Sequence, residues 1–405
     1  MNEYVKTAAL GQRKLKDRNS VVCQSFAVTY EYIVAFTRGL FDPENTLLAE
    51  ALGPLGVMGP HKCLVYIDAG VAQSNPGLSD RIVAYFDKHA ASASLAVPPF
   101  EVAGGENVKA DFERVFDIYR NIKEFNIDRH SYVIAIGGGA VLDAVGLAAA
   151  TSHRGVRHIR VPTTVLSQND SGVGVKNGVN FEGSKNFTGA FAPPSAVLND
   201  LDLLASLPSD ARREGISEAV KVALIRDGEF FLWLEDNCDA LRAFEPDAEE
   251  QMIRRSAQLH MNQIARGGDP FEAGSARPLD FGHWSAHKLE ILTAYEVSHG
   301  AAVAIGIALD ARYSVLAGLL QSGEDERIAR LLEGLGLELW HPALKARDTD
   351  GRLEILKGLQ EFREHLGGEL TVTLISDLGV GVEVNEMDPG LVSDAITWLA
   401  TRGAR

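Results

Sequence analysis

The first half of the chain alternates short β-branched runs with amphipathic stretches. The strand-like runs are KCLVYIDAG, LAVPPFEV, SYVIAIGGG and VRHIRVPTT, and helical periodicity covers about residues 79–90 and 108–125 between them. Strands that alternate with helices at this spacing predict βαβ units and a mainly parallel sheet. We therefore expect an α/β domain at the N-terminal end.

From about Pro208 onward, helical periodicity dominates. It is clearest in ISEAVKVALI, EEQMIRRSAQLHMNQIA, AAVAIGIALDARYSVLA and DERIARLLEGL, and one strand-like run, LTVTLIS, follows late in the chain. At 405 residues the chain is long enough for two or three domains with a core in each. We predict an α/β domain at residues 1–206 and a mainly helical domain at 207–405, with a cleft between them as a natural place for a site.

Charge and cysteine content narrow the classes of partner. The chain has 39 basic and 55 acidic residues, a net charge of −16, and no long basic run, which argues against nucleic acid or an anionic membrane as the main partner. Cys23, Cys63 and Cys238 have no CxxC spacing, so neither a disulfide framework nor a thiolate zinc site is predicted. No apolar run reaches the roughly 18 residues of a membrane helix, and the first residues lack an apolar signal region. We expect a cytoplasmic protein.

The segment SYVIAIGGGAVLDAVGLAAATS predicts a strand, a tight glycine turn and a helix. Gly137, Gly138 and Gly139 lack a Cβ atom, so their amides can approach a pyrophosphate at the positive end of the helix. The segment lacks the GxGxxG spacing, and a plain turn is the alternative. We expect Asp143 in the first helical turn, where it either favours the helix dipole or accepts hydrogen bonds from a cofactor.

Residues 161–191 form a glycine-rich, polar stretch that we expect to be irregular. Long irregular stretches inside compact domains are usually functional. Its polar members include Thr163, Thr164, Asp170, Lys176, Lys185 and Asn186. Ammonium groups and an amide on a flexible backbone suit a phosphorylated polyol, and a solvated loop is the alternative.

Two further segments carry candidate chemistry. In DFGHWSAHKLE, His283 and His287 are four residues apart and share a helix face, which suits either a metal site or an ordinary surface helix. In ISEAVKVALI, Glu218 and Lys221 are three residues apart, and an exposed ion pair is the simpler interpretation.

Taken in order, these segments resemble a known family. GGGAVLDAVGLAAATSHRGVRHIRVPTT, NDSGVGVKNGVN, SKNFTGAF, SEAVK, DFGHWSAH and SHGAAVAIG are similar to the motifs of the 3-dehydroquinate synthase-like sugar phosphate cyclases, over about residues 68–307. The resemblance implies a Rossmann-like, NAD-binding α/β domain, a mainly helical metal-binding domain, an active site between them and a homodimer.

The resemblance also assigns roles by position. NAD contacts fall on Asp68, Glu106, Lys109, Gly138, Gly139, Asp143, Thr163, Thr164 and Lys185. The metal ligands are Glu218, His283 and His299, a set that suits zinc or cobalt with positions left open for substrate. Catalytic roles fall on Lys221, His287, Asp170 and Lys176. Substrate contacts fall on Asn186, Arg154, His260, Asp280, Arg363 and His365, with Arg154 expected to reach the phosphate from a partner subunit.

The chemistry that the resemblance implies uses NAD catalytically. A hydroxyl of a sugar phosphate is oxidised, phosphate leaves by β-elimination, the ketone is reduced again, and the opened enol closes by an intramolecular aldol step. In this scheme His287 moves a proton and is not a metal ligand, and Lys221 stabilises oxyanion charge.

Departures from the dehydroquinate synthases bear on the substrate. Where the dehydroquinate synthases have a lysine, this chain has His260. Where they have an arginine, it has Ala276, beside Arg277, and where they have an asparagine, it has Asp280. Loss of a guanidinium and gain of a carboxylate disfavour a carboxylated substrate.

A neutral ketose phosphate is therefore favoured, as in the sedoheptulose 7-phosphate cyclases (valiolone-type synthases), which share DFGH and an FREHLGG-like segment at 362–368. The best-known of those synthases have proline where this chain has His287, so the match to them is incomplete. The alternatives are a 3-dehydroquinate synthase, a metal-dependent NAD polyol or glycerol phosphate dehydrogenase, and a non-catalytic sensor of NAD or sugar phosphate.

Overall fold

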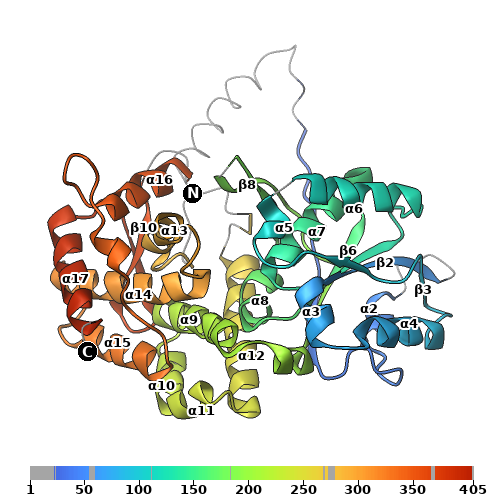
Figure 1. Ribbon diagram of the computed structural model, residues 1–405, viewed down its shortest axis with the longest axis horizontal. Coiled ribbons are helices and arrows are strands. Elements are labelled where there is room, and N and C mark those ends of the chain that lie inside the picture. Colours follow the sequence, from blue (N-terminus) through green and yellow to red (C-terminus); the bar gives the residue numbers. More distant parts are fainter. Residues whose placement is uncertain are drawn as a thin grey trace.

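The structure is a computed structural model that describes residues 22, 24–53, 60–110, 112–182, 184–267, 270–271, 279–365 and 370–403. Its N-terminal part, blue to green in Figure 1, lies beside its C-terminal part, yellow to red. The two parts meet where α8 (Val165–Asn169) packs against α9 (Ser209–Arg226) and α12 (Pro246–Arg266).

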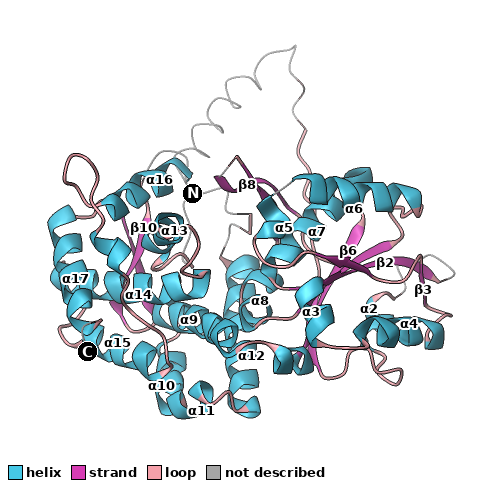
Figure 2. Cartoon of the chain, in the orientation of Figure 1, coloured by secondary structure: helices cyan, strands magenta, loops and turns pink. Residues whose placement is uncertain are grey.

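The N-terminal part is built on a parallel sheet, drawn in magenta in Figure 2. Its strand order is β1 (Ile33–Thr37), β9 (Ala196–Asp200), β6 (Arg157–Pro162), β5 (Tyr132–Gly137), β2 (His61–Asp68) and β3 (Ala93–Leu95), and β4 (Phe100–Val102) also pairs with β2. Each of these strand pairs is parallel. The predicted parallel sheet is confirmed, except that LAVPPFEV forms two strands because its prolines cannot donate to a ladder.

Helices cover both faces of this sheet. Alternate side chains of β2 and β5 enter two different cores, so Val65 and Ile134 pack toward one face and Tyr66 and Val133 toward the other. The first core includes α2 (Leu47–Ala51) and α4 (Leu78–Lys88), and the second includes α6 (Phe112–Glu124) and α7 (Gly139–Thr151). Burial on both faces explains why the strands read as nearly continuous apolar runs.

The stretch at 161–191 is more regular than we expected. Thr164 caps α8 through a reciprocal capping box with Ser167, and β7 (Lys176–Phe181) and β8 (Ser184–Phe191) then form an antiparallel hairpin. The prediction of an irregular segment is therefore wrong. The glycines that suggested a loop instead allow close approach, since the Cα atom of Gly178 lies 3.4 Å from the position that a Cβ atom on Gly189 would take.

The C-terminal part is mainly helical, as predicted. Its elements are α9, α10 (Gly228–Asp236), α11 (Cys238–Arg242), α12, α13 (His283–Leu292), α14 (His299–Leu316), α15 (Glu324–Gly334), α16 (Lys357–His365) and α17 (Pro389–Arg402), together with the antiparallel pair β10 (Val372–Asp377) and β11 (Val380–Val384). The division after residue 206 stays a prediction, and α9 begins at Ser209. Among the described helices, none has the length and apolarity to cross a bilayer.

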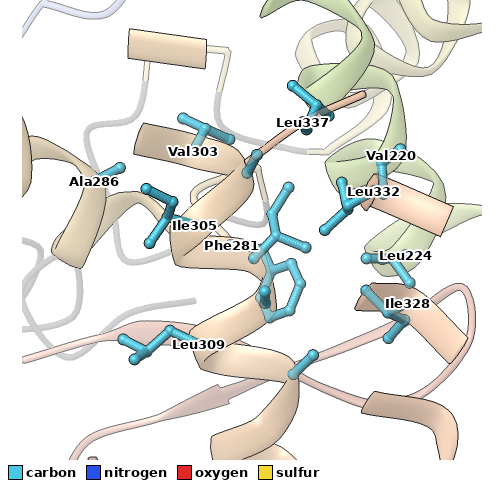
Figure 3. Close-up of a cluster of buried hydrophobic side chains, with 14 of the residues drawn as sticks. Val220, Leu224, Phe281, Ala286, Val303, Ile305, Leu309, Ile328, Leu332 and Leu337 are labelled. Atoms are coloured by element: carbon cyan, nitrogen blue, oxygen red, sulfur yellow. The ribbon is translucent and has the colours of Figure 1, made fainter. Parts of the chain in front are cut away.

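One core joins the helices that hold the site. Phe281 is fully buried among Val220, Leu224, Ile305 and Ile328, which come from α9, α14 and α15 (Figure 3). Burying a phenylalanine side chain contributes about 2–3 kcal/mol. Because Phe281 lies two residues before the start of α13, this packing fixes where that helix begins.

Candidate active site

A carboxylate and two imidazoles converge from three helices. Glu218 lies in α9, His283 is the first residue of α13, and His299 is the first residue of α14. Oε1 of Glu218 lies 3.7 Å from Nε2 of His283 and 3.5 Å from Nε2 of His299. The ligand atoms of these residues all lie within 4.8 Å of one another, so the structure brings together the residues expected to bind a metal.

The spacing of these atoms fits a zinc-sized ion. Two ligands about 2.1 Å from a tetrahedral ion are about 3.4 Å apart, close to the separations found. Oε1 of Glu218 is buried and lacks a well-aligned hydrogen-bond partner among the described residues. Nδ1 of His283 donates to the backbone oxygen of Phe281 at 3.1 Å, which leaves the Nε2 lone pair to face the site.

Glu290 extends the cluster on the outer side of His299. His287, Glu290 and His299 form a second group whose ligand atoms lie within 4.8 Å. Glu290, however, already accepts a hydrogen bond from Nζ of Lys185 at 2.6 Å and one from Nδ1 of His299 at 3.3 Å. It therefore orients His299, whose Nε2 points to Glu218. Sequence analysis missed Glu290, although it lies three residues after His287 and so on the same helix face.

Charges in this cluster are strongly coupled. Burial alone would lower the pKa of His299, but hydrogen bonds and charges from Glu218 and Glu290 raise it to about 10. For the carboxyl group of Glu218, burial alone would raise the pKa, but the charge of Lys221 lowers it to about 2. Burial and Lys221 together lower the pKa of His283 to about 4. Two ionised carboxylates thus face the imidazoles, which is a donor set suited to a cation.

Lys221 links the cluster of Glu218, His283 and His299 to a second carboxylate. Its ammonium contacts Glu218 and lies 3.6 Å from Oδ1 of Asp170, which Nδ1 of His260 contacts at 2.9 Å. Burial would raise the pKa of Asp170, but Lys221 and His260 lower it below its usual range. Glu218 and Lys221 are both buried, so the interpretation as an exposed ion pair is wrong.

Asp280 and His287 border this cluster. Burial alone would lower the pKa of Lys221, but Asp170 and Glu218 raise it above its usual value, and the charge of Asp280 adds to this effect. The ring of His287 is exposed and lies 5.5 Å from the ring of His283 and 5.8 Å from that of His299. His287 is thus open to a bound molecule beside the expected metal ligands.

At the other end of the site, the strand β5 enters α7 through the predicted glycine turn. A Cβ atom on Gly138 would lie 3.3 Å from the methyl group of Thr164, and one on Gly139 would lie 2.8 Å from Oγ of Ser171. Oγ1 of Thr163 and Oγ of Ser171 are buried without a hydrogen-bond partner among the described residues. This backbone cradle with orphaned hydroxyls fits a phosphate-bearing cofactor.

The remaining expected NAD contacts surround this turn. Asp68 caps α3 (Ala69–Ser74), and its Cβ atom lies 3.2 Å from the position of a Cβ atom on Gly137. Nζ of Lys109, in α5 (Asn107–Ala110), donates to Asp143 at 3.0 Å and to Oδ1 of Asn186 at 2.5 Å. We predicted Asp143 in the first turn of α7, and this prediction is wrong. The helix begins at Gly139, so Asp143 lies one turn further along.

Asn186 and Glu106 complete the network at this end. Oδ1 of Asn180 accepts a hydrogen bond from the backbone amide of Asn186 at 2.9 Å, and Nδ2 of Asn180 donates to Glu106 at 3.5 Å. Asn186, which we expected to bind substrate, therefore contacts residues expected to bind the nucleotide. Lys185 is also placed differently, since its ammonium lies on Glu290.

The comparisons with known proteins agree with this arrangement. The profile of the 3-dehydroquinate synthase N-terminal domain matches residues 99–214, and that of the C-terminal domain matches residues 215–357. A 3-dehydroquinate synthase from Halorhodospira halophila (strain DSM 244 / SL1) is 39% identical over 75% of this chain and 84% of its own length. The chain belongs to the 3-dehydroquinate synthase family.

Other members of this family differ in activity. A 2-epi-5-epi-valiolone synthase from Streptomyces glaucescens is 37% identical over 88% of each chain. The structure of a 2-epi-5-epi-valiolone synthase from Streptomyces hygroscopicus subsp. jinggangensis 5008, with NAD+ and Zn2+ bound, superposes with a TM-score of 0.82 at 30% identity and covers 94% of this chain and 100% of that one. Family membership therefore establishes a cyclase scaffold but leaves the substrate to be argued from the site.

Three further residues expected in the site are exposed. Arg154 is exposed beyond the far end of α7, about 20 Å along that helix from the glycine turn. Lys176 is exposed at the start of β7, and Arg363 is exposed near the end of α16. The side chain of His365, and with it Ala276, Arg277 and Cys23, lies outside the described residues.

Two buried residues that support the site escaped sequence analysis. Arg160 donates to the backbone oxygens of Gly172, Gly174 and Lys176 at 2.7–3.0 Å and so fixes the chain between Asp170 and β7. Asp310 accepts hydrogen bonds from the amide of Gly282 at 3.0 Å and from Nε1 of Trp284 at 2.9 Å, on either side of His283. Arg160 lies in the strand-like run VRHIRVPTT and Asp310 in the helical run AAVAIGIALDARYSVLA, and these patterns did not single out either residue.

Proposed function

We propose that the chain is a sugar phosphate cyclase that uses NAD and a divalent metal, zinc or cobalt, and acts on a neutral ketose phosphate, with sedoheptulose 7-phosphate as the favoured substrate. Phosphate would be eliminated and a cyclitol formed, which makes the enzyme a carbon–oxygen lyase. The observation that carries the choice of substrate is Asp280, whose carboxylate acts on the buried Lys221 beside the metal cluster.

The charge around Lys221 supports a substrate without a carboxylate. Lys221 is the central cation, and Glu218 and Asp170 already surround it, with Asp280 adding a further negative charge. A substrate carboxylate next to Asp280 would be repelled by it, whereas sugar hydroxyls can donate hydrogen bonds to its oxygens. The two valiolone synthases found among the relatives fit this choice.

In this proposal NAD supplies reversible hydride transfer and the metal polarises a substrate oxygen. Glu218, His283 and His299 hold the metal, and the turn at Gly138 holds the nucleotide. Lys221, kept protonated by its carboxylates, stabilises developing oxyanion charge.

The proton-handling groups lie around the same cluster. His287, with its exposed ring beside the ligands, is placed to move a proton, and Asp170 fixes the imidazole of His260 through Nδ1. Arg154 serves the site of a second subunit in a homodimer.

A 3-dehydroquinate synthase is the second candidate. A dehydroquinate synthase is 39% identical to this chain. This chain also has His287 where, by the family resemblance, the best-known valiolone-type synthases have proline. The two candidates differ in whether the substrate carries a carboxylate, so a single comparison of substrates separates them.

The test is to incubate metal-loaded protein with NAD and either sedoheptulose 7-phosphate or the carboxylated heptulosonate phosphate, and to follow phosphate release and NADH absorbance. Phosphate release from the neutral sugar alone, without net NADH, is expected. Release from the carboxylated sugar alone would establish the second candidate. Net NADH formation would instead indicate a dehydrogenase. If the protein binds either sugar phosphate but releases no phosphate and forms no NADH, it is a sensor.

Replacement of Asp280 by asparagine tests the basis of this choice. We expect Asp280→Asn to lower kcat/KM for the neutral ketose by about tenfold or more, or roughly 1.4 kcal/mol of transition-state stabilisation. Asp210→Asn, at the exposed start of α9, is the matched control and should leave kcat/KM unchanged. Full activity of Asp280→Asn on the neutral sugar would show that this carboxylate does not select the substrate.

A further inference from the structure

The strand β8 lies between the two ends of the site. Its neighbouring residues Lys185 and Asn186 contact different parts of the molecule: Lys185 reaches Glu290 in α13, and Asn186 reaches Lys109 in α5. The pairing of β7 with β8 shifts register opposite these residues, and such an irregularity re-aims side chains, so one short segment can touch both parts. Asn186 also has a positive φ of 51°, which is uncommon for a residue other than glycine.

On the metal side, the contacts form a continuous chain. Nζ of Lys185 donates to Oε1 of Glu290 at 2.6 Å, and Nδ1 of His299 contacts Oε2 of the same carboxylate at 3.3 Å. The Glu290 side chain is only 3% exposed. Both oxygens of Glu290 are engaged. A movement of Lys185 must therefore change either the position of the Glu290 carboxylate or the electrostatic potential at the ring of His299.

Tyr295 adds a second contact to Lys185. The ammonium lies 4.9 Å from the centre of the Tyr295 ring, in the turn that follows α13. Ala294 and Tyr295 both have positive φ values, 50° and 65°, a conformation that is unfavourable without glycine and persists where surrounding contacts hold it. The position of Lys185 is therefore set by the helix that begins with His283.

On the nucleotide side, Asn186 belongs to the network around the glycine turn. Nζ of Lys109 bridges Oδ1 of Asn186 and the carboxylate of Asp143, and Lys109 is only 4% exposed. Asp143 lies in α7, the helix whose N-terminus forms the cradle for the cofactor. A cofactor that orders this turn would also order β8.

We propose that β8 couples cofactor binding to the metal centre, with Lys185 and Glu290 acting as positioning residues for His299. This inference rests on the proposed use of NAD and a metal. When the nucleotide orders β8, Lys185 stays on Glu290 and Glu290 stays on Nδ1 of His299, so the metal meets a ligand that is already oriented. Binding that orders a shared element gives positive cooperativity, and the coupling must be reciprocal.

The experiment measures the dissociation constant of Zn2+ by competition with a chelator, with and without saturating NAD+, in the full-length protein. For the wild type we expect NAD+ to tighten Zn2+ binding about 5- to 150-fold, the usual range of such coupling. The reciprocal titration of NAD+, with and without Zn2+, should give the same factor.

Two variants interrupt the series of contacts from Lys185 through Glu290 to His299 at different points. Glu290→Gln should weaken Zn2+ binding about 10- to 100-fold, as loss of a partner of a ligand histidine does, and should reduce the coupling factor to near one. Lys185→Met should weaken Zn2+ binding in the absence of NAD+ less than Glu290→Gln does, because Glu290 can still contact His299, but it should also bring the factor to near one. In the double variant, the factor should fall no further than in either single variant.

Lys288→Met is the matched control. It removes another ion pair of α13, that between Lys288 and Glu361 at 2.5 Å, without touching His299, and should keep the wild-type factor. Coupling that persists in Lys185→Met and Glu290→Gln, or a wild type that binds both Zn2+ and NAD+ independently, would overturn this inference and leave the proposed function standing. A wild type that binds neither would overturn both.

Discussion

At the nucleotide end of the site, the chain presents mainly backbone: a turn through Gly138 and Gly139, with the ion pair of Lys109 and Asp143 beside it. At the metal end it presents charge, since the buried Lys221 contacts both the buried Glu218 and the half-buried Asp170. The nucleotide end leaves space for a ligand to approach the backbone, whereas the metal end holds opposite charges in fixed positions. The two ends should therefore fail in different ways when they are altered.

The largest effect is expected at the metal end. Glu218→Gln keeps the shape of the side chain but removes the charge that faces both imidazoles. Loss of a residue that only supports a ligand lowers metal affinity about 10- to 100-fold, so loss of a ligand should lower it about a thousandfold or more, roughly 4 kcal/mol. The Zn2+ dissociation constant measures this change.

Asp210→Asn, on the same helix but exposed, is the control for Glu218→Gln and should bind Zn2+ as the wild type does. NAD+ affinity without metal should be nearly unchanged in both variants. If Glu218→Gln binds Zn2+ as tightly as the control, the cluster of Glu218, His283 and His299 is not the metal site.

A second prediction concerns the support beneath the metal end. Burial raises the pKa of Asp310 to about 7, although Trp284 and Gly282 donate hydrogen bonds to it. Because this pKa is higher in the folded than in the unfolded chain, the stabilisation from Asp310 is complete below about pH 4 and is lost as the pH rises toward 7.

Asp310→Asn cannot titrate, so its stability relative to the wild type should change with pH. From pH 5 to pH 7.5, the wild type should lose roughly 2–3 kcal/mol of free energy of unfolding relative to the variant, at about 1.4 kcal/mol per pKa unit. Urea unfolding at several pH values measures this difference. Parallel pH profiles for the two proteins would mean that Asp310 does not titrate in this range.

The same contrast explains what the sequence could predict. The turn at the nucleotide end is local, so strand, glycines and helix were visible in one continuous segment. The hairpin of β7 and β8 was missed because glycines signal loops as well as close strand approach. Asp143 was placed one turn too early because helix starts are uncertain by a few residues when they are read from sequence.

The metal end could not be derived from local pattern. Glu218, His283 and His299 come from three helices, and only the resemblance to a family joined them before the structure did. Spacing alone suggested His283 with His287, whereas the compact set uses His299 in place of His287. Arg160 and Asp310 have no local signal of function, because their roles depend on which hydrogen-bond partners the fold brings to them.

The smallest effect on stability is expected at the nucleotide end. Gly138 has φ −72° and ψ 174°, a conformation open to any residue, and an added Cβ atom would lie 3.3 Å from the nearest side-chain atom. Gly138→Ala should therefore change the free energy of unfolding by no more than about 0.5 kcal/mol. It should still lower NAD+ affinity about tenfold, or 1.4 kcal/mol, because the methyl group occupies the path of the phosphates.

Gly146→Ala, two turns further along α7, provides the opposite case. Its Cβ atom would lie 1.9 Å from Oδ1 of Asn177, so the variant should lose about 1–3 kcal/mol of stability through overpacking. Thermal unfolding and NAD+ titration of both variants distinguish a glycine that is needed for ligand binding from one that is needed for packing. If Gly138→Ala loses stability but keeps NAD+ affinity, the glycine turn serves the fold and the nucleotide binds elsewhere.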